Sequence, residues 1–214
     1  MITRRAMLSL TAAGACAPLL AACQSSTPWH GTDISGSLPQ LDFTLTRASD
    51  GKIVHGADYR GKVALVYFGY TFCPDLCPTT LQNLTLMLQT LGPLADRIRV
   101  LFVTVDPNRD TETVLKQYVS SFAPQTVGLR GTPDQLAAFA KRCRVAYSVT
   151  PAKGDQPYQV THSSVVYVFD ATGKARLLFS DLSTPKPDLA GTEADLRRLA
   201  AAATAALPPR HRFG

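Results

Sequence analysis

The feature that most restricts the fold is a continuous apolar run at residues 63–68, which reads Val-Ala-Leu-Val-Tyr-Phe. A short run rich in β-branched and aromatic side chains is typical of a strand buried on both faces. A leucine stripe with helical spacing follows within residues 81–91, and a second apolar run lies at residues 98–105. A strand, a helix and a strand in this order predict a right-handed βαβ unit with parallel strands.

The remaining patterns extend this unit into a mixed sheet. Two short strands around an Asp-Gly step predict an N-terminal β-hairpin, a second hairpin surrounds Asp-Ala-Thr-Gly, and three further amphipathic stretches predict helices. The expected strands cover residues 41–45, 52–54, 165–169 and 175–179, and the expected helices cover residues 114–122, a stretch opening at 132–135, and 192–207. We therefore predict an α/β fold, with a mixed central sheet flanked by helices and an extra N-terminal hairpin.

The first 22 residues have the pattern of an export signal. Arg4 and Arg5 precede an apolar stretch that is rich in small residues and contains Pro18, which is too weak for a lasting membrane span. The arginine pair fits a twin-arginine signal and an ordinary secretory signal equally well. Leu-Ala-Ala before Cys23 resembles a bacterial lipobox, so we predict cleavage of residues 1–22 and acylation of Cys23.

Composition divides the rest of the chain. Residues 23–40 are rich in Ser, Thr, Gly and Pro and are predicted to be a flexible tether. Residues 41–207 form the predicted folded domain, and residues 208–214 a basic tail. The formal net charge is +6, but the basic residues are scattered and form no aromatic-interleaved patch. We therefore expect a monomer that does not bind nucleic acid.

Cysteine usage points to chemistry in the folded domain. Of five cysteines, Cys16 lies in the signal and Cys23 at the lipidation site, which leaves Cys73, Cys77 and Cys143. An odd number in an oxidising compartment excludes a simple disulfide framework. Cys143 shares a helical face with apolar residues and is predicted to be a buried small hydrophobe.

The other two cysteines follow the carboxyl end of the predicted central strand and lead into a helix. Ligands bind at this edge of an open α/β sheet, and a helix N-terminus stabilises thiolate. If Cys73 and Cys77 adopt a helical turn, their Cα atoms lie roughly 6 Å apart, so the thiols can pair or share a metal. Asp75, between them, is predicted to be a helix N-cap or to tune the thiolates.

His162 is the best candidate for a third ligand. It lies at the mouth of the predicted strand at residues 165–169, which brings it to the cysteines if that strand is antiparallel to the central one. His30, His55 and His211 lie in the predicted tether, a polar turn and the tail, so they are expected to be solvated.

Three motifs carry a resemblance to a known family. They are Phe-Gly-Tyr-Thr-Phe-Cys-Pro-Asp-Leu-Cys-Pro at 68–78, Val-Asp-Pro-Asn-Arg-Asp-Thr at 105–111 and Val-Thr-His-Ser at 160–163. In identity, order and spacing they resemble the Sco/SenC copper chaperones, over about residues 29–207. The resemblance implies a thioredoxin-like fold, Cys73, Cys77 and His162 as copper ligands, and a role in assembling the binuclear copper centre of cytochrome c oxidase subunit II.

Two details bear on the metal. The family usually has an acidic residue immediately before the ligand histidine, whereas this chain has Thr161, which puts the tuning of the imidazole in question. Soft thiolates select Cu(I) and imidazole also suits Cu(II), so the predicted set fits either oxidation state. Zinc is the main competitor, but a structural zinc site needs a fourth strong ligand and none lies nearby in sequence.

The leading hypothesis is a lipid-anchored metallochaperone on the periplasmic side of a bacterial membrane, rather than an enzyme. Its expected partners are apo cytochrome c oxidase subunit II, a copper donor and a thiol reductant. The alternative is a periplasmic thiol-disulfide oxidoreductase that keeps partner cysteines reduced, with Cys73 and Cys77 as its redox pair. A peroxiredoxin-like peroxidase is a third, weaker hypothesis.

Overall fold

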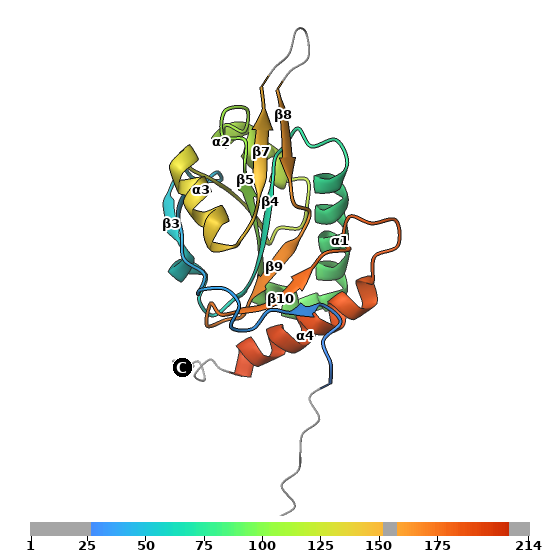
Figure 1. The fold of residues 1–214 in the computed structure, drawn as a ribbon. Helices are drawn as coiled ribbons and strands as arrows, with labels where there is room; N and C mark the ends of the chain where they lie inside the picture. Colours follow the sequence, from blue (N-terminus) through green and yellow to red (C-terminus); the bar gives the residue numbers. More distant parts are fainter. Residues whose placement is uncertain (1–26, 152–157, 206–214) are drawn as a thin grey trace, which may run out of the picture.

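The computed structural model describes residues 27–151 and 158–205, which form a sheet packed between helices (Figure 1). The strands are β1 (Thr32–Asp33), β2 (Thr44–Arg47), β3 (Ile53–His55), β4 (Val63–Gly69), β5 (Ile98–Thr104), β6 (Thr126–Arg130), β7 (Tyr147–Thr150), β8 (Gln159–His162), β9 (Val166–Phe169) and β10 (Ala175–Phe179). The helices are α1 (Leu76–Leu91), α2 (Glu112–Val119), α3 (Pro133–Arg142) and α4 (Leu189–Ala205), with short 3-10 helices η1 (Gly56–Tyr59) and η2 (Gly92–Arg97).

The main sheet has the strand order β1-β10-β9-β4-β5-β6-β2-β3. β4, β5 and β6 are parallel neighbours, and β9 pairs antiparallel with β4 on the other side. β7 and β8 form a separate antiparallel hairpin that extends from one end of the domain (Figure 1). The predicted mixed sheet is therefore confirmed, and β4 lies near its centre.

Apolar side chains of the sheet pack into two cores, one on each face. Side chains such as Leu65 and Phe102 pack with residues of α1, α2 and α4. On the opposite face, Phe68 and Leu101 pack with residues of α3 and of β2. Every residue of β4 is buried, as predicted for a strand covered on both faces.

Local signals placed the end of α1 and the start of α3 correctly, whereas α2 covers Glu112–Val119 in place of the predicted 114–122. α1 ends where the Gly92-Pro93 step interrupts it, and Thr111 caps α2 by accepting a hydrogen bond from the Val114 N–H. Thr132 and Gln135 form the predicted capping box of α3, with proline at its first turn. α4 begins at Leu189, three residues before the predicted start.

The predicted flexible tether is wrong for residues 27–40. Trp29 lies against the Arg198 guanidinium, 3.7 Å from the ring centroid, and the His30 and Gly31 N–H groups donate to the buried Asp195 carboxylate. β1 then adds an edge strand beside β10. Composition suggested a linker, but the Trp29 ring and two backbone N–H groups that donate to a buried carboxylate are enough to fix the segment to α4.

Three strands beyond β1 were not predicted. β6 is short and is interrupted by Gly128, so it lacks a continuous apolar run. The strands β7 and β8 are mainly polar and pair only with each other in the described part of the chain. The N-terminal hairpin is confirmed, although β2 starts three residues later and β3 one residue later than expected.

Several predictions concern residues that the structure does not describe. They are the signal at 1–22, the lipidated Cys23, His211 and the tail at 208–214. Within residues 27–151 and 158–205, none of the helices combines the length and the hydropathy needed to cross a bilayer.

Candidate metal centre

The two predicted thiols lie at the carboxyl end of β4, where the chain turns into α1. Cys73 lies in the connecting loop and Cys77 is the second residue of the helix, with exposed fractions of 9% and 0%. Gly69 ends β4 directly beside them. A Cβ at this position would lie 2.7 Å from Cys77 Sγ and 2.6 Å from Phe102 Cε2, so the absence of a side chain lets the sulfur approach the strand.

The two thiols are electrostatically different. The pKa of Cys73 is lowered to about 3, chiefly because the Cys77 thiol donates a hydrogen bond to its sulfur; the His162 side chain and backbone N–H groups act in the same direction, and burial opposes them. The Cys77 N–H is one of these donors, 3.4 Å from Cys73 Sγ, so the sulfur partly caps α1.

Cys77 shows the opposite shift. Its pKa is raised above the usual thiol range, first by the hydrogen bond that its own proton makes to Cys73 and then by burial. The pair therefore releases one proton readily and retains the other. A soft cation bound between the sulfurs would take the place of the retained proton.

His162 ends β8, opposite Tyr147 in the hairpin register. Its Nδ1 lies 2.9 Å from the carbonyl oxygen of Ser163, which can only accept, so Nδ1 carries the proton. Nε2, the other ring nitrogen, faces the sulfurs and lies 3.3 Å from Cys77 Sγ. The Ser163 carbonyl thus orients the imidazole. In many metal sites a carboxylate that does not itself bind the metal has this role.

The structure brings the three predicted ligand residues together. Cys73 Sγ, Cys77 Sγ and a His162 ring nitrogen all lie within 4.8 Å of one another. Sulfur and nitrogen ligands bind a metal ion at about 2.0–2.3 Å. Two ligand atoms on opposite sides of one ion are therefore about 4–4.6 Å apart, slightly closer than the limit observed here. A small inward movement therefore suffices to place all three around one ion.

A surface pocket gives access to the cluster. A pocket of about 200 Å³ is lined by Cys73 and His162 together with Tyr70, Pro74, Leu76 and other neighbours, whereas Cys77 is not among its walls. A partner entering this pocket therefore meets one sulfur and the imidazole. The second sulfur lies behind them, against β4.

Sequence reasoning missed the aromatic side chains around the histidine. The Tyr70 and Tyr67 rings meet the His162 ring edge-on, with centroids 5.5 and 6.1 Å away. The Tyr67 and Thr80 hydroxyls are buried near Cys77 without a hydrogen-bond partner among the described residues. Their contribution depends on which side chains meet across β4 and α1, for which the sequence carries no local signal.

The other predicted residues lie away from this cluster or play lesser parts. Asp75 occupies the N-cap position of α1, but its carboxylate makes no capping bond to the backbone and accepts only from the Thr79 hydroxyl, 3.5 Å away. Cys143 is 2% exposed, and burial raises its pKa to about 12, which confirms the prediction of an inert core residue. His30 contacts Asp188 and His55 contacts Thr44, both at exposed positions.

A comparison with known proteins gives the family. The SCO1/SenC family model matches residues 33–198. The chain belongs to the SCO1/SenC family. The predicted resemblance is therefore confirmed, over a slightly shorter range than expected.

Individual relatives agree with this assignment. A SCO2-like protein of Rickettsia felis is 38% identical over 146 residues, which cover 68% of this chain and 71% of the relative. Among solved structures, Bradyrhizobium japonicum ScoI with copper bound is 36% identical at a TM-score of 0.66 and covers 75% of this chain and 98% of its own. Arabidopsis thaliana ScoI with copper bound is 29% identical at a TM-score of 0.67, with 76% and 98% covered. These likenesses confirm the predicted thioredoxin-like fold.

Proposed function

We propose that this protein is a copper metallochaperone that binds one copper ion through Cys73, Cys77 and His162. The observation that carries the proposal is the convergence of two thiols and one imidazole nitrogen, from segments 85 residues apart, within 4.8 Å. Thiolates favour Cu(I), and an added imidazole accommodates Cu(II). The two relatives whose structures contain copper support this choice of metal.

The arrangement of the ligands suits a metal that is passed on. Three ligands leave the coordination of the ion incomplete, and the pocket gives an incoming ligand access from the side of Cys73 and His162. We infer that exchange begins there and that Cys77, which is fully buried, releases the ion last. Oxidation of both thiols to a disulfide removes the two thiolates and so abolishes binding.

The acceptor and the location complete the proposal. The acceptor is the binuclear copper site of apo cytochrome c oxidase subunit II, as the family resemblance implies. The predicted acylation of Cys23 holds the domain at the periplasmic side of a bacterial membrane. A copper donor and a thiol reductant act before transfer, because only the reduced dithiol binds the ion.

Anaerobic titration of the reduced protein with Cu(I) tests the ligand set. We expect one equivalent of Cu(I) to bind to the wild-type protein and to Cys143→Ser, the matched control, whereas Cys73→Ser and Cys77→Ser are expected to lose stoichiometric binding. In a parallel titration with Cu(II), His162→Ala is expected to bind at least about 100-fold more weakly than the wild-type protein. Binding that is indifferent to all three ligand substitutions would contradict the proposal.

The stabilised thiolate of Cys73 favours one second candidate, a thiol-disulfide oxidoreductase. In this reaction the Cys73 thiolate attacks a partner disulfide and releases one partner thiolate. Cys77 then attacks the Cys73 sulfur, loses its proton and releases the second thiolate, so two electrons pass to the partner. This function predicts that His162→Ala keeps full reductase activity, whereas either cysteine substitution abolishes it.

A further inference from the structure

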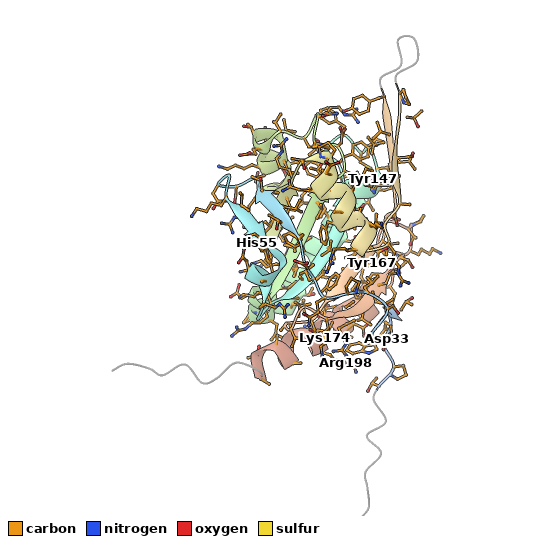
Figure 2. The ribbon with its side chains drawn as sticks, turned by 60° about the vertical axis from the view of Figure 1, so that its left-hand side comes forward. Asp33, His55, Tyr147, Tyr167, Lys174 and Arg198 are labelled. Atoms are coloured by element: carbon orange, nitrogen blue, oxygen red, sulfur yellow. The ribbon has the colours of Figure 1, made fainter. Side chains whose placement is uncertain are left out.

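The position of His162 depends on a hairpin that lies outside the main sheet. Among the described residues, β7 and β8 pair only with each other, and Figure 2 shows Tyr147 on this hairpin, away from Asp33 and Arg198 at the other end of the molecule. An isolated two-stranded hairpin is at best marginally stable in water. Contacts with the rest of the domain must therefore set the distance between His162 and the sulfurs.

One polar contact joins the hairpin to the domain beside the metal centre. The hydroxyl of Tyr158, immediately before β8, donates to Asp106 Oδ1 at 2.6 Å. Asp106 is only 2% exposed, and its other oxygen accepts from Arg109 Nε at 2.5 Å. A hydrogen bond to a buried, ion-paired carboxylate is stronger than one between neutral groups.

The Arg109 side chain contacts the hairpin and the cysteine loop together. Its guanidinium carbon lies 4.1 Å from the ring centroid of Tyr158. It also lies 5.0 Å from the ring centroid of Phe72 and 5.7 Å from that of Tyr70. Phe72 directly precedes Cys73, and Tyr70 meets the His162 ring edge-on. A single cation therefore lies between the two ligand-bearing segments.

Asp110, which follows Arg109, also holds the cysteine loop by hydrogen bonds. The Asp110 carboxylate accepts from the Thr71 N–H at 3.1 Å and from the Thr71 hydroxyl at 2.6 Å. It accepts as well from the Thr104 hydroxyl at the end of β5, and it is fully buried. We call residues 106–110 the 106–110 turn. Its Asp110 holds the loop that contains Cys73, and its Asp106 holds Tyr158, which directly precedes the strand that contains His162.

We propose that the 106–110 turn positions the metal ligands, with the Asp106–Tyr158 hydrogen bond holding His162 over the two sulfurs. The proposal rests on the proposed copper-binding function, but its structural part applies to the metal-free protein as well. Asp106, Arg109 and Tyr158 are positioning residues, since they act through His162 and do not bind the ion. Tyr158 lies only four residues from His162 on a short extended segment, so release of one end moves the other.

The metal-free protein provides the first test. Tyr158→Phe removes only the hydroxyl and keeps the ring beside Arg109. Amide hydrogen exchange at residues 159–162 is expected to become about tenfold faster, the effect of losing one hydrogen bond of ordinary net strength. Tyr147→Phe is the matched control, because its hydroxyl makes no hydrogen bond within the described part of the chain, and it is expected to leave exchange unchanged.

The second test uses a double-mutant cycle on Cu(II) binding. Tyr158→Phe is expected to weaken Cu(II) binding about tenfold in the protein that retains His162, and to have no effect in the His162→Ala background. The affinity for Cu(I) is expected to change much less, because two thiolates can hold Cu(I) without the imidazole. A merely structural role of Tyr158 would weaken binding equally in both backgrounds.

The outcomes separate this inference from the proposed function. If the wild-type protein binds no copper, the proposed function fails, and the exchange experiment still decides whether the hydrogen bond holds the hairpin. If copper binds but the Tyr158→Phe effect is absent, or is the same with and without His162, the positioning role is refuted. Unchanged exchange in Tyr158→Phe refutes it as well.

Discussion

The sulfur side and the imidazole side of the candidate metal centre are held in place by different parts of the fold. Cys77 packs against Gly69 of β4, a strand buried throughout its length and paired on both edges. His162 stands on a hairpin outside the main sheet, in which β7 is mostly exposed, with Val149 at 51%, and Val160 of β8 is buried. The central sheet thus holds the sulfur side of the site, whereas Val160 and a few side-chain contacts hold the imidazole side.

This difference has a functional meaning. Under the proposed function, the buried sulfur of Cys77 would keep the ion bound, whereas the imidazole on a less strongly held element would leave and return at lower cost. An exchangeable site benefits from such asymmetry, because a partner can replace one ligand while the others retain the ion. Changes made on the two sides of the site are therefore expected to have effects of different size.

The largest expected effect is on thiol reactivity in the metal-free protein. Cys73 has a pKa lowered to about 3 by its hydrogen bonds, whereas burial raises that of Cys143 to about 12. Below its pKa, the thiolate fraction of a cysteine rises roughly tenfold per pH unit. Between pH 5 and pH 8 we therefore expect the alkylation rate of Cys143 to rise about a thousandfold and that of Cys73 to stay nearly constant.

Iodoacetamide labelling followed by peptide mass spectrometry measures both rates in one sample. Each cysteine serves as the control for the other, since both occur in the same chain. A Cys73 rate that climbs with pH in parallel with that of Cys143 would show that the hydrogen bonds from Cys77 and its neighbours do not stabilise the Cys73 thiolate.

The next effect concerns stability. Leu65→Ala removes a fully buried side chain from β4 and is expected to lower the free energy of unfolding by about 2–5 kcal/mol. Val149→Ala on the exposed hairpin is expected to change it by less than about 0.5 kcal/mol. Urea denaturation of both variants provides the comparison, and equal losses would contradict the view that the hairpin lies outside the cooperative core.

A smaller effect is expected at the close approach between β4 and Cys77. Gly69→Ala places a methyl group against Cys77 Sγ and Phe102, so we expect copper to bind about 10–100-fold more weakly. Gly128→Ala is the matched control, because its methyl group would lie 2.8 Å from Leu115 Cγ, in the same core but away from the sulfurs.

Both glycine substitutions overpack the core and are expected to destabilise the fold by about 1–3 kcal/mol. Only Gly69→Ala is expected to change the copper dissociation constant, measured by competition with a chelator under anaerobic conditions. Equal weakening of copper binding by the two variants would assign the effect to general destabilisation.

The smallest effect is expected at Thr161, where the family usually has an acidic residue. The Thr161 side chain is exposed, and the Ser163 carbonyl already holds the Nδ1 proton of His162. Thr161→Asp is therefore expected to change Cu(II) affinity by less than about threefold, against a far larger loss in His162→Ala. A tenfold gain in Thr161→Asp would show that the carbonyl does not orient the ring.

The sequence predicted the frame of the domain well. The strands at β4, β5, β9 and β10 followed from apolar runs and a turn signal, and α1 followed from its leucine stripe and the Gly92-Pro93 stop. The polar hairpin β7–β8 and the short strand β6 were missed, because neither has a periodic apolar pattern. The docking of residues 27–33 was missed because its composition resembles a linker, although Trp29 and a buried carboxylate hold it.

Within the candidate site, the three candidate ligand residues were predicted from their types and spacing, and the structure brings them together. Their convergence depended on the antiparallel pairing of β9 with β4, which the structure confirms. The Asp106–Tyr158 contact joins residues 52 positions apart. Asp106 lies in the motif at residues 105–111, but no local feature of the sequence links it to Tyr158.

The chain by itself determined which segments become strands and helices and which residues offer soft ligands, because hydrophobic periodicity, caps and side-chain chemistry are local properties. Only the tertiary structure decided how far His162 lies from the sulfurs and what holds it there. That distance is the result of strand pairing and of a few long-range polar contacts, whose energies depend on burial and geometry that no short stretch of sequence encodes.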